Sequence, residues 1–89
     1  MKTTRNTKLY NRRNSELGAR ILRETSQRGH FAGREPFSKF SMARVLFTRP
    51  NSRTHDRIET VCDMFVRAGR METYNWSGTK MYRRILPHI

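Results

Sequence analysis

The sequence predicts a small α+β domain in which three helices precede a C-terminal β-hairpin. Three observations lead to this prediction. Apolar residues recur at helical spacing over residues 53–68, two earlier stretches show weaker helical spacing, and residues 71–85 change to a pattern typical of strands. Because the chain has only 89 residues, we expect one domain with a small core.

The first two helices are predicted on either side of a glycine- and proline-containing loop. The first covers residues 15 to about 28, with Leu17 and Ile21 on one face. The second covers residues 37–47 and ends before Pro50, since the residue that precedes a proline is pushed out of the helical region.

The third helix, over residues 53–68, has the clearest apolar face in the chain. Its apolar positions follow the i, i+3, i+4, i+7, i+8 pattern: Ile58, Val61, Cys62, Phe65 and Val66. Asn51 and Ser52 are candidate N-cap residues, and Gly69 is expected to end the helix.

The C-terminal stretch predicts a hairpin. Residues 71–76 and 81–85 are rich in strand-forming side chains, and the polar link 77–80 between them contains a glycine. Polar and aromatic residues alternate here, so one face of the hairpin can be apolar. Trp76 is expected to pack against the third helix in preference to the alternative, stacking on nucleobases.

The charge of the chain points to a polyanionic partner. Nineteen Lys and Arg residues against seven Asp and Glu residues give a net charge of +12 and an isoelectric point near 11.4. Residues 1–13 contain five basic residues and no acidic one, so residues 1–14 are expected to form a basic flexible arm and residues 15–89 the folded domain.

Several classes of protein are excluded. Mean hydropathy is −0.88 and no apolar run approaches the roughly 18 residues that cross a bilayer, so no membrane partner is expected. The single cysteine excludes an intramolecular disulfide, and no signal peptide is evident, which together predict a cytoplasmic protein. No phosphate-binding loop or metal-ligand spacing is present, and Cys62 falls on a buried face, so no catalytic residue, metal or cofactor is expected.

The order of the predicted elements resembles the winged helix-turn-helix family of DNA-binding domains. The resemblance covers about residues 15–86 and is carried by residues 37–47, the tight turn 48–51, residues 53–68 with the stop at Gly69, and the hairpin at 71–85. It implies a three-helix winged helix-turn-helix domain that binds double-stranded DNA, most often in transcription regulation. The small size and the lack of an effector domain suit a phage or mobile-element protein that works at the nucleoid or in a host cytoplasm.

The resemblance also implies where DNA would bind. The helix that starts near Arg53 would enter the major groove, through Arg53, Thr54, His55, Arg57 and Thr60. The hairpin would contact the minor groove or the backbone, through Asn75, Ser77, Thr79, Lys80, Arg83 and Arg84. Phosphates would be contacted by Lys39, Arg49, Lys80 and the arm residues Arg5, Lys8, Arg12 and Arg13.

Two other functions stay open at this stage. A ribosome-associated RNA-binding protein would use the same basic arm and small core, although Asp56, Glu59 and Asp63 on one helix argue against a surface that is basic on every face. A small protein-docking inhibitor of a host enzyme would expose Tyr74 and Trp76 together with Glu72. A homodimer through the first helix also stays open, as does the choice between activation, repression and an architectural role.

Overall fold

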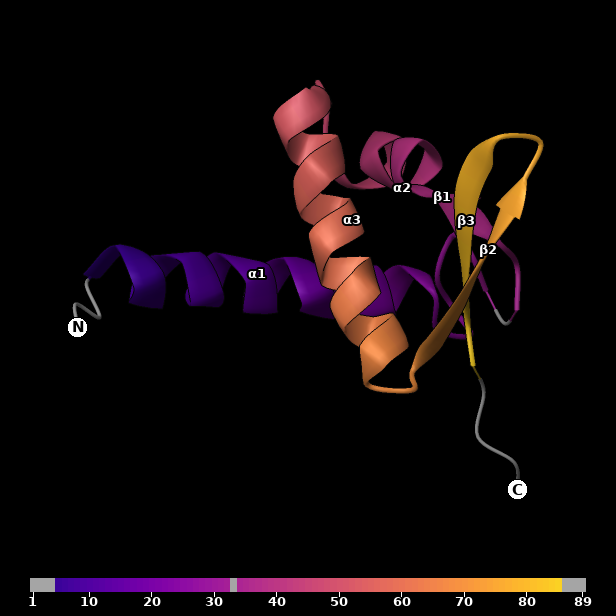
Figure 1. Cartoon of the computed structure of the whole chain (residues 1–89), viewed down its shortest axis with the longest axis horizontal. Helices are drawn as coiled ribbons and strands as arrows, with labels where there is room; N and C mark the ends of the chain where they lie inside the picture. Colours follow the sequence, from indigo (N-terminus) through magenta and orange to yellow (C-terminus); the bar gives the residue numbers. More distant parts are fainter. Residues whose placement is uncertain (1–4, 33, 86–89) are drawn as a thin grey trace.

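The computed structural model describes residues 5–32 and 34–85, with side chains from residue 12 onward, and confirms the α+β class. Three helices accompany a three-stranded antiparallel sheet in the order β1-β3-β2 (Figure 1). The elements are α1 (Arg5–Glu24), β1 (Phe37–Ser38), α2 (Lys39–Leu46), α3 (Ser52–Arg67), β2 (Met71–Trp76) and β3 (Thr79–Arg84).

The first helix differs from the prediction at both ends. It begins at Arg5 instead of residue 15, and its N-terminal half extends past the rest of the molecule (Figure 1). The prediction relied on an apolar face, and the sequence of residues 5–14 shows almost none at helical spacing. The helix also ends at Glu24, short of residue 28, because the chain folds back on its last turn. The Phe31 N–H donates to the Glu24 carbonyl at 2.7 Å, and a Cβ on Gly29 would lie 2.3 Å from the carbonyl carbon of Glu24.

The short strand β1 was not predicted, and it takes the place of the first turn expected for the second helix. Phe37 is buried and pairs with Tyr82 of β3. Helix α2 begins only at Lys39, because Ser38 and Ser41 form a reciprocal capping box, in which each side-chain oxygen accepts a hydrogen bond from the other residue's backbone N–H.

Helix α3 confirms the predicted caps. The Asn51 side chain accepts a hydrogen bond from the Thr54 N–H at 2.9 Å, and the helix begins at the next residue after Asn51. At the other end, Gly69 has a φ of +77° and the Arg70 N–H donates to the Phe65 carbonyl at 2.8 Å. This is the left-handed glycine ending that the sequence predicted.

The hairpin is tighter than predicted. Only Ser77 and Gly78 separate the two strands, and both have positive φ, 52° and 81°, as a two-residue type I′ turn requires. Strand β3 therefore starts at Thr79, directly opposite Trp76, and not at residue 81.

The core lies where α1 crosses α3 and where both meet the sheet (Figure 1). Gly18 permits the crossing, because a Cβ at this position would lie 3.1 Å from the Phe65 ring and 3.5 Å from Val61. The buried hydrophobic side chains of the described residues are Leu17, Ile21, Phe31, Phe37, Met42, Ala43, Leu46, Ile58, Val61, Cys62, Met71 and Tyr82. One core therefore holds helices and sheet together and fixes the start of α3 relative to the hairpin.

Candidate nucleic-acid interface

The start of α3 presents two exposed arginines. Arg49 lies in the turn between α2 and α3, and Arg53 lies in the first turn of α3. Thr54, predicted to contact DNA, is half-buried and its hydroxyl lies 3.0 Å from the Asn51 side-chain oxygen. Thr54 therefore stabilises the start of the helix, while Arg49 and Arg53 extend from it.

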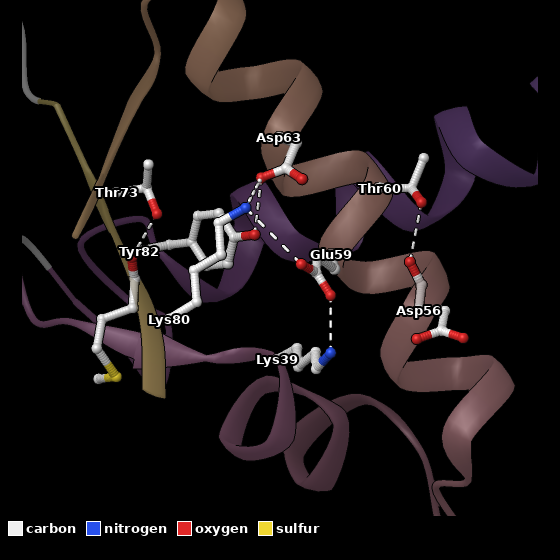
Figure 2. A network of polar contacts seen from close by, with 9 residues as sticks. Lys39, Asp56, Glu59, Thr60, Asp63, Thr73, Lys80 and Tyr82 are labelled. Carbon is white, nitrogen blue, oxygen red and sulfur yellow. Dashed lines mark hydrogen bonds and ion pairs between the residues drawn. The ribbon is translucent and has the colours of Figure 1, made fainter. Parts of the chain in front are cut away.

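Two further predicted positions on α3 differ in exposure. His55 is half-buried, and its ring lies edge-on to the Phe40 ring of α2 with 4.8 Å between centroids. Thr60 is exposed, and its hydroxyl donates to the Asp56 carbonyl at 2.9 Å (Figure 2). His55 thus belongs to the α2–α3 contact, and Thr60 to the outward surface of the helix.

Arg57 lies beside α1, in a hollow of about 250 Å³ that three arginines line. Arg13 and Arg20 of α1 line it together with Arg57, and Glu16 is the acidic residue there. Arg20 is held in place, because it donates to the Leu46 carbonyl at 2.6 Å and its guanidinium lies over the Phe47 ring. Arg12 is also exposed on α1.

Arg20 is not among the residues that the sequence predicts to contact DNA. It lies seven positions after Arg13, with Leu17 between them, so the two arginines and one core residue share a helix face. Extending the predicted helix toward the N-terminus would have revealed this pair.

Two lysines predicted to contact phosphate are instead part of an ion-pair network with α3 (Figure 2). The ammonium group of Lys39 lies 2.7 Å from the Glu59 carboxylate. That of Lys80 lies 2.8 Å from Asp63 and 3.7 Å from Glu59, and the Tyr82 hydroxyl donates to Asp63 at 2.8 Å. The network ties the start of α2 and the hairpin to the middle of α3, and it places both lysine charges against carboxylates.

The pKa values in this network follow from its contacts. Partial burial acts to raise the pKa of Asp63, but hydrogen bonds from Lys80 and Tyr82 outweigh it, and the pKa of Asp63 is lowered. The same hydrogen bond from Lys80 raises the pKa of Lys80. Burial and the neighbouring Asp63 raise the pKa of the Tyr82 hydroxyl. All three groups therefore keep their usual charge states at neutral pH.

The hairpin residues predicted to contact DNA do not all lie on the same side of the two-stranded ribbon. Asn75 and Ser77 are exposed near the turn, and Thr79 is half-buried. Arg83 is paired with Glu72, at 2.6 Å between its Nε and the carboxylate.

The expected packing of Trp76 against α3 is wrong. Its side chain is 67% exposed, because the register of the strands turns it to the side of the hairpin that faces away from Asp63 and α3. Tyr74, two residues earlier on the same side, is 38% exposed.

Among the lysines and arginines whose side chains the structure describes, those outside ion pairs are all arginines. The pairs use Arg34, Lys39, Lys80 and Arg83. The described arginines outside these pairs are Arg12, Arg13, Arg20, Arg23, Arg28, Arg44, Arg49, Arg53, Arg57, Arg67, Arg70 and Arg84. Arginine presents a planar fork of donors that fits phosphate and the guanine edge in two-point contacts.

Three further properties of the described residues concern the cysteine thiol, metal binding and membrane spans. Burial, followed by the neighbouring Asp63, raises the pKa of the Cys62 thiol to about 12, so the thiol stays protonated at neutral pH. Within residues 5–32 and 34–85, no group of three or more His, Cys, Asp or Glu side chains could hold a metal ion. No helix in those ranges is long and apolar enough to cross a lipid bilayer.

Comparison with known proteins gives no relative: no protein-family description, no curated protein and no solved structure matches this chain.

Proposed function

We propose that this protein is a small winged helix-turn-helix protein that binds double-stranded DNA. The order of three helices and a C-terminal hairpin supports this fold assignment, as does the tight turn between α2 and α3. In this proposal the protein acts in the cytoplasm, at the nucleoid, as a transcription regulator of phage or mobile-element type.

One observation carries the proposal: the arginines left outside ion pairs include Arg49 and Arg53 at the start of α3 and Arg57 one turn later. Their guanidinium groups suit phosphate oxygens and the O6 and N7 atoms of guanine. The acidic residues Glu59 and Asp63 of the same helix are neutralised by Lys39 and Lys80, which lowers their repulsion of a phosphate backbone.

The arrangement of the elements supports a single contact surface. The N-terminus of α3 and the turn of the hairpin point toward the same end of the molecule, with α2 also at that end (Figure 1). A duplex lying across this end would meet Arg53 in its major groove and the exposed Asn75 and Ser77 beside it.

The experiment that tests the proposal compares two double variants with equal loss of charge. Arg53→Ala/Arg57→Ala is expected to weaken binding to a selected duplex about tenfold or more, since each lost two-point contact with a base costs about 1–3 kcal/mol. Arg23→Ala/Arg28→Ala removes two exposed arginines from the end of α1 and the loop after it, and is expected to weaken binding by less than threefold, roughly the effect of net charge alone.

The selected duplex comes from repeated enrichment of a random-sequence pool on the wild-type protein. Circular dichroism checks that both variants keep the fold. Equal losses of affinity in the two double variants would contradict base recognition by α3. They would indicate that net charge alone attracts the duplex.

A further inference from the structure

The hairpin presents a second surface, which we call the outer hairpin face. The register of β2 and β3 divides their side chains between two sides of the ribbon. On the inner side, Lys80 and Tyr82 bond to Asp63 of α3 (Figure 2). The outer hairpin face consists of Glu72, Tyr74, Trp76, Thr79, Met81 and Arg83.

The outer hairpin face exposes its aromatic rings to solvent. Trp76 is 67% exposed and Tyr74 38%, so neither ring is used by the core that the described residues form. Both lie on β2, which is an edge strand of the sheet. A tryptophan beside a two-residue turn has few neighbours to restrict its approach to a partner. Two exposed aromatic rings on one side of a strand offer a partner apolar area at one place on the surface.

The charges around these rings favour an anionic partner. The Arg83 guanidinium lies 5.8 Å from the centre of the Tyr74 ring. The acidic residue of this face, Glu72, is paired with both Arg83 at 2.6 Å and Arg34 at 3.7 Å. Arg34 lies beside the outer hairpin face and is not part of it, so the face with this neighbour carries one net positive charge. A second copy of the chain would bring another charge of +12, which opposes self-association here.

We propose that the outer hairpin face binds unpaired nucleobases, with Trp76 as the principal stacking residue and Tyr74 as the second. Bases stack on exposed aromatic rings whatever their sequence, and nearby arginines contact the phosphates. The inference rests on the proposed function for its geometry, because a duplex held by the start of α3 would bring a single-stranded overhang or a frayed end toward the hairpin turn (Figure 1).

The test uses the fluorescence of Trp76, which is the only tryptophan of the chain. The full-length protein is titrated with a blunt duplex, with the same duplex carrying an oligothymidine overhang, and with free oligothymidine. We expect quenching of Trp76 by the overhang and by free oligothymidine, and little quenching by the blunt duplex. The overhang is expected to raise affinity about tenfold over the blunt end.

Three variants make the test specific. Because two of these variants lack the only tryptophan, the affinity of every protein is measured from the fluorescence anisotropy of a dye-labelled nucleic acid. Trp76→Ala should abolish the advantage of the overhang and leave affinity for the blunt duplex unchanged, whereas Trp76→Phe should keep most of the advantage. Met64→Ala removes another exposed apolar side chain, on α3, and should change neither measurement. Equal affinity of the wild type for blunt and overhanging duplexes, or an advantage that survives Trp76→Ala, would overturn the inference.

The same titrations separate this inference from the proposed function. Binding of the blunt duplex without any quenching by unpaired bases would overturn the inference and leave duplex binding intact. Quenching by free oligothymidine without measurable binding of the blunt duplex would support the inference and contradict the proposed function. Trp76 emission that is red-shifted and unchanged by all three nucleic acids would overturn the inference in favour of a protein partner.

Discussion

At the scale of single residues, Asp63 is an acidic side chain that stabilises the fold of a basic protein. It accepts hydrogen bonds from Lys80 and from the Tyr82 hydroxyl, both at 2.8 Å, and these contacts lower its pKa despite partial burial. A carboxyl group whose pKa is lower in the folded state stabilises that state fully above its ordinary pKa of about 4. The stabilisation is lost as the pH falls through the lower, folded-state pKa.

This sign gives a prediction for Asp63→Asn. The variant should be less stable than the wild type by about 1 kcal/mol at pH 7, because its partly exposed ion pair with Lys80 is lost. Between pH 5 and pH 2 it should lose less stability than the wild type does. Thermal unfolding followed by circular dichroism across this pH range measures both effects.

The control for this prediction is Asp56→Asn. Asp56 lies on the same helix, is exposed, and takes part in no ion pair between described residues. Its variant should follow the acid dependence of the wild type. An Asp63→Asn protein with the same acid dependence as the wild type would show that the carboxylate contributes nothing to the folded state.

Sequence reasoning was least successful for individual side chains of the candidate site. Arg53 was predicted to be exposed, and it is, because helical periodicity determines which positions face away from a core. The ion pairs of Lys39 and Lys80 could not be predicted from the sequence, because only tertiary packing brings Glu59 and Asp63 next to them. Trp76 was misplaced because alternation shows that a strand has two sides and does not show which side meets the helix.

At the scale of secondary-structure elements, local signals were sufficient for some elements and not for others. Helix α3 was predicted nearly to the residue, because its apolar period, its Asn51 cap and its Gly69 ending are all encoded within one stretch of chain. Strand β1 was missed, since its two residues become a strand only by pairing with β3 far along the chain. The N-terminal half of α1 was missed because the sequence of residues 5–14 shows almost no apolar face at helical spacing.

The crossing of α1 and α3 depends on Gly18, and this gives a prediction at the element scale. Gly18→Leu would place a large side chain against Phe65, where even a Cβ would lie 3.1 Å from the ring. Forcing extra volume into this contact should lower the free energy of unfolding by about 1–3 kcal/mol. Denaturant unfolding of the full chain measures the change.

Ala19→Leu is the matched control, because Ala19 is the next residue of α1 and is exposed. The control should unfold within about 0.5 kcal/mol of the wild type. Equal stability of the two leucine variants would show that the helices can separate at this point without cost, and that Gly18 does not set their approach.

At the scale of the whole molecule, the basic side chains that form ion pairs lie in a different region from most of the arginines that do not. The acidic residues Glu59, Asp63 and Glu72 are paired with basic side chains around the hairpin, within the described part of the chain. Arginines outside such pairs extend over α1, the turn before α3 and α3 itself. Most of these described arginines are exposed, so a polyanion can reach them, and this accessible positive charge is the physical basis of the proposed function.

The most direct measurement of this central claim is the affinity of the purified protein for mixed-sequence duplex DNA, duplex RNA and single-stranded RNA across a salt series. We expect duplex DNA to bind best, and the logarithm of its affinity to fall linearly with the logarithm of salt concentration, with a slope equivalent to several phosphates. Equal or tighter binding of either RNA would contradict it in favour of a structural RNA-binding role, and weak binding of all three at physiological salt would contradict it in favour of a protein partner.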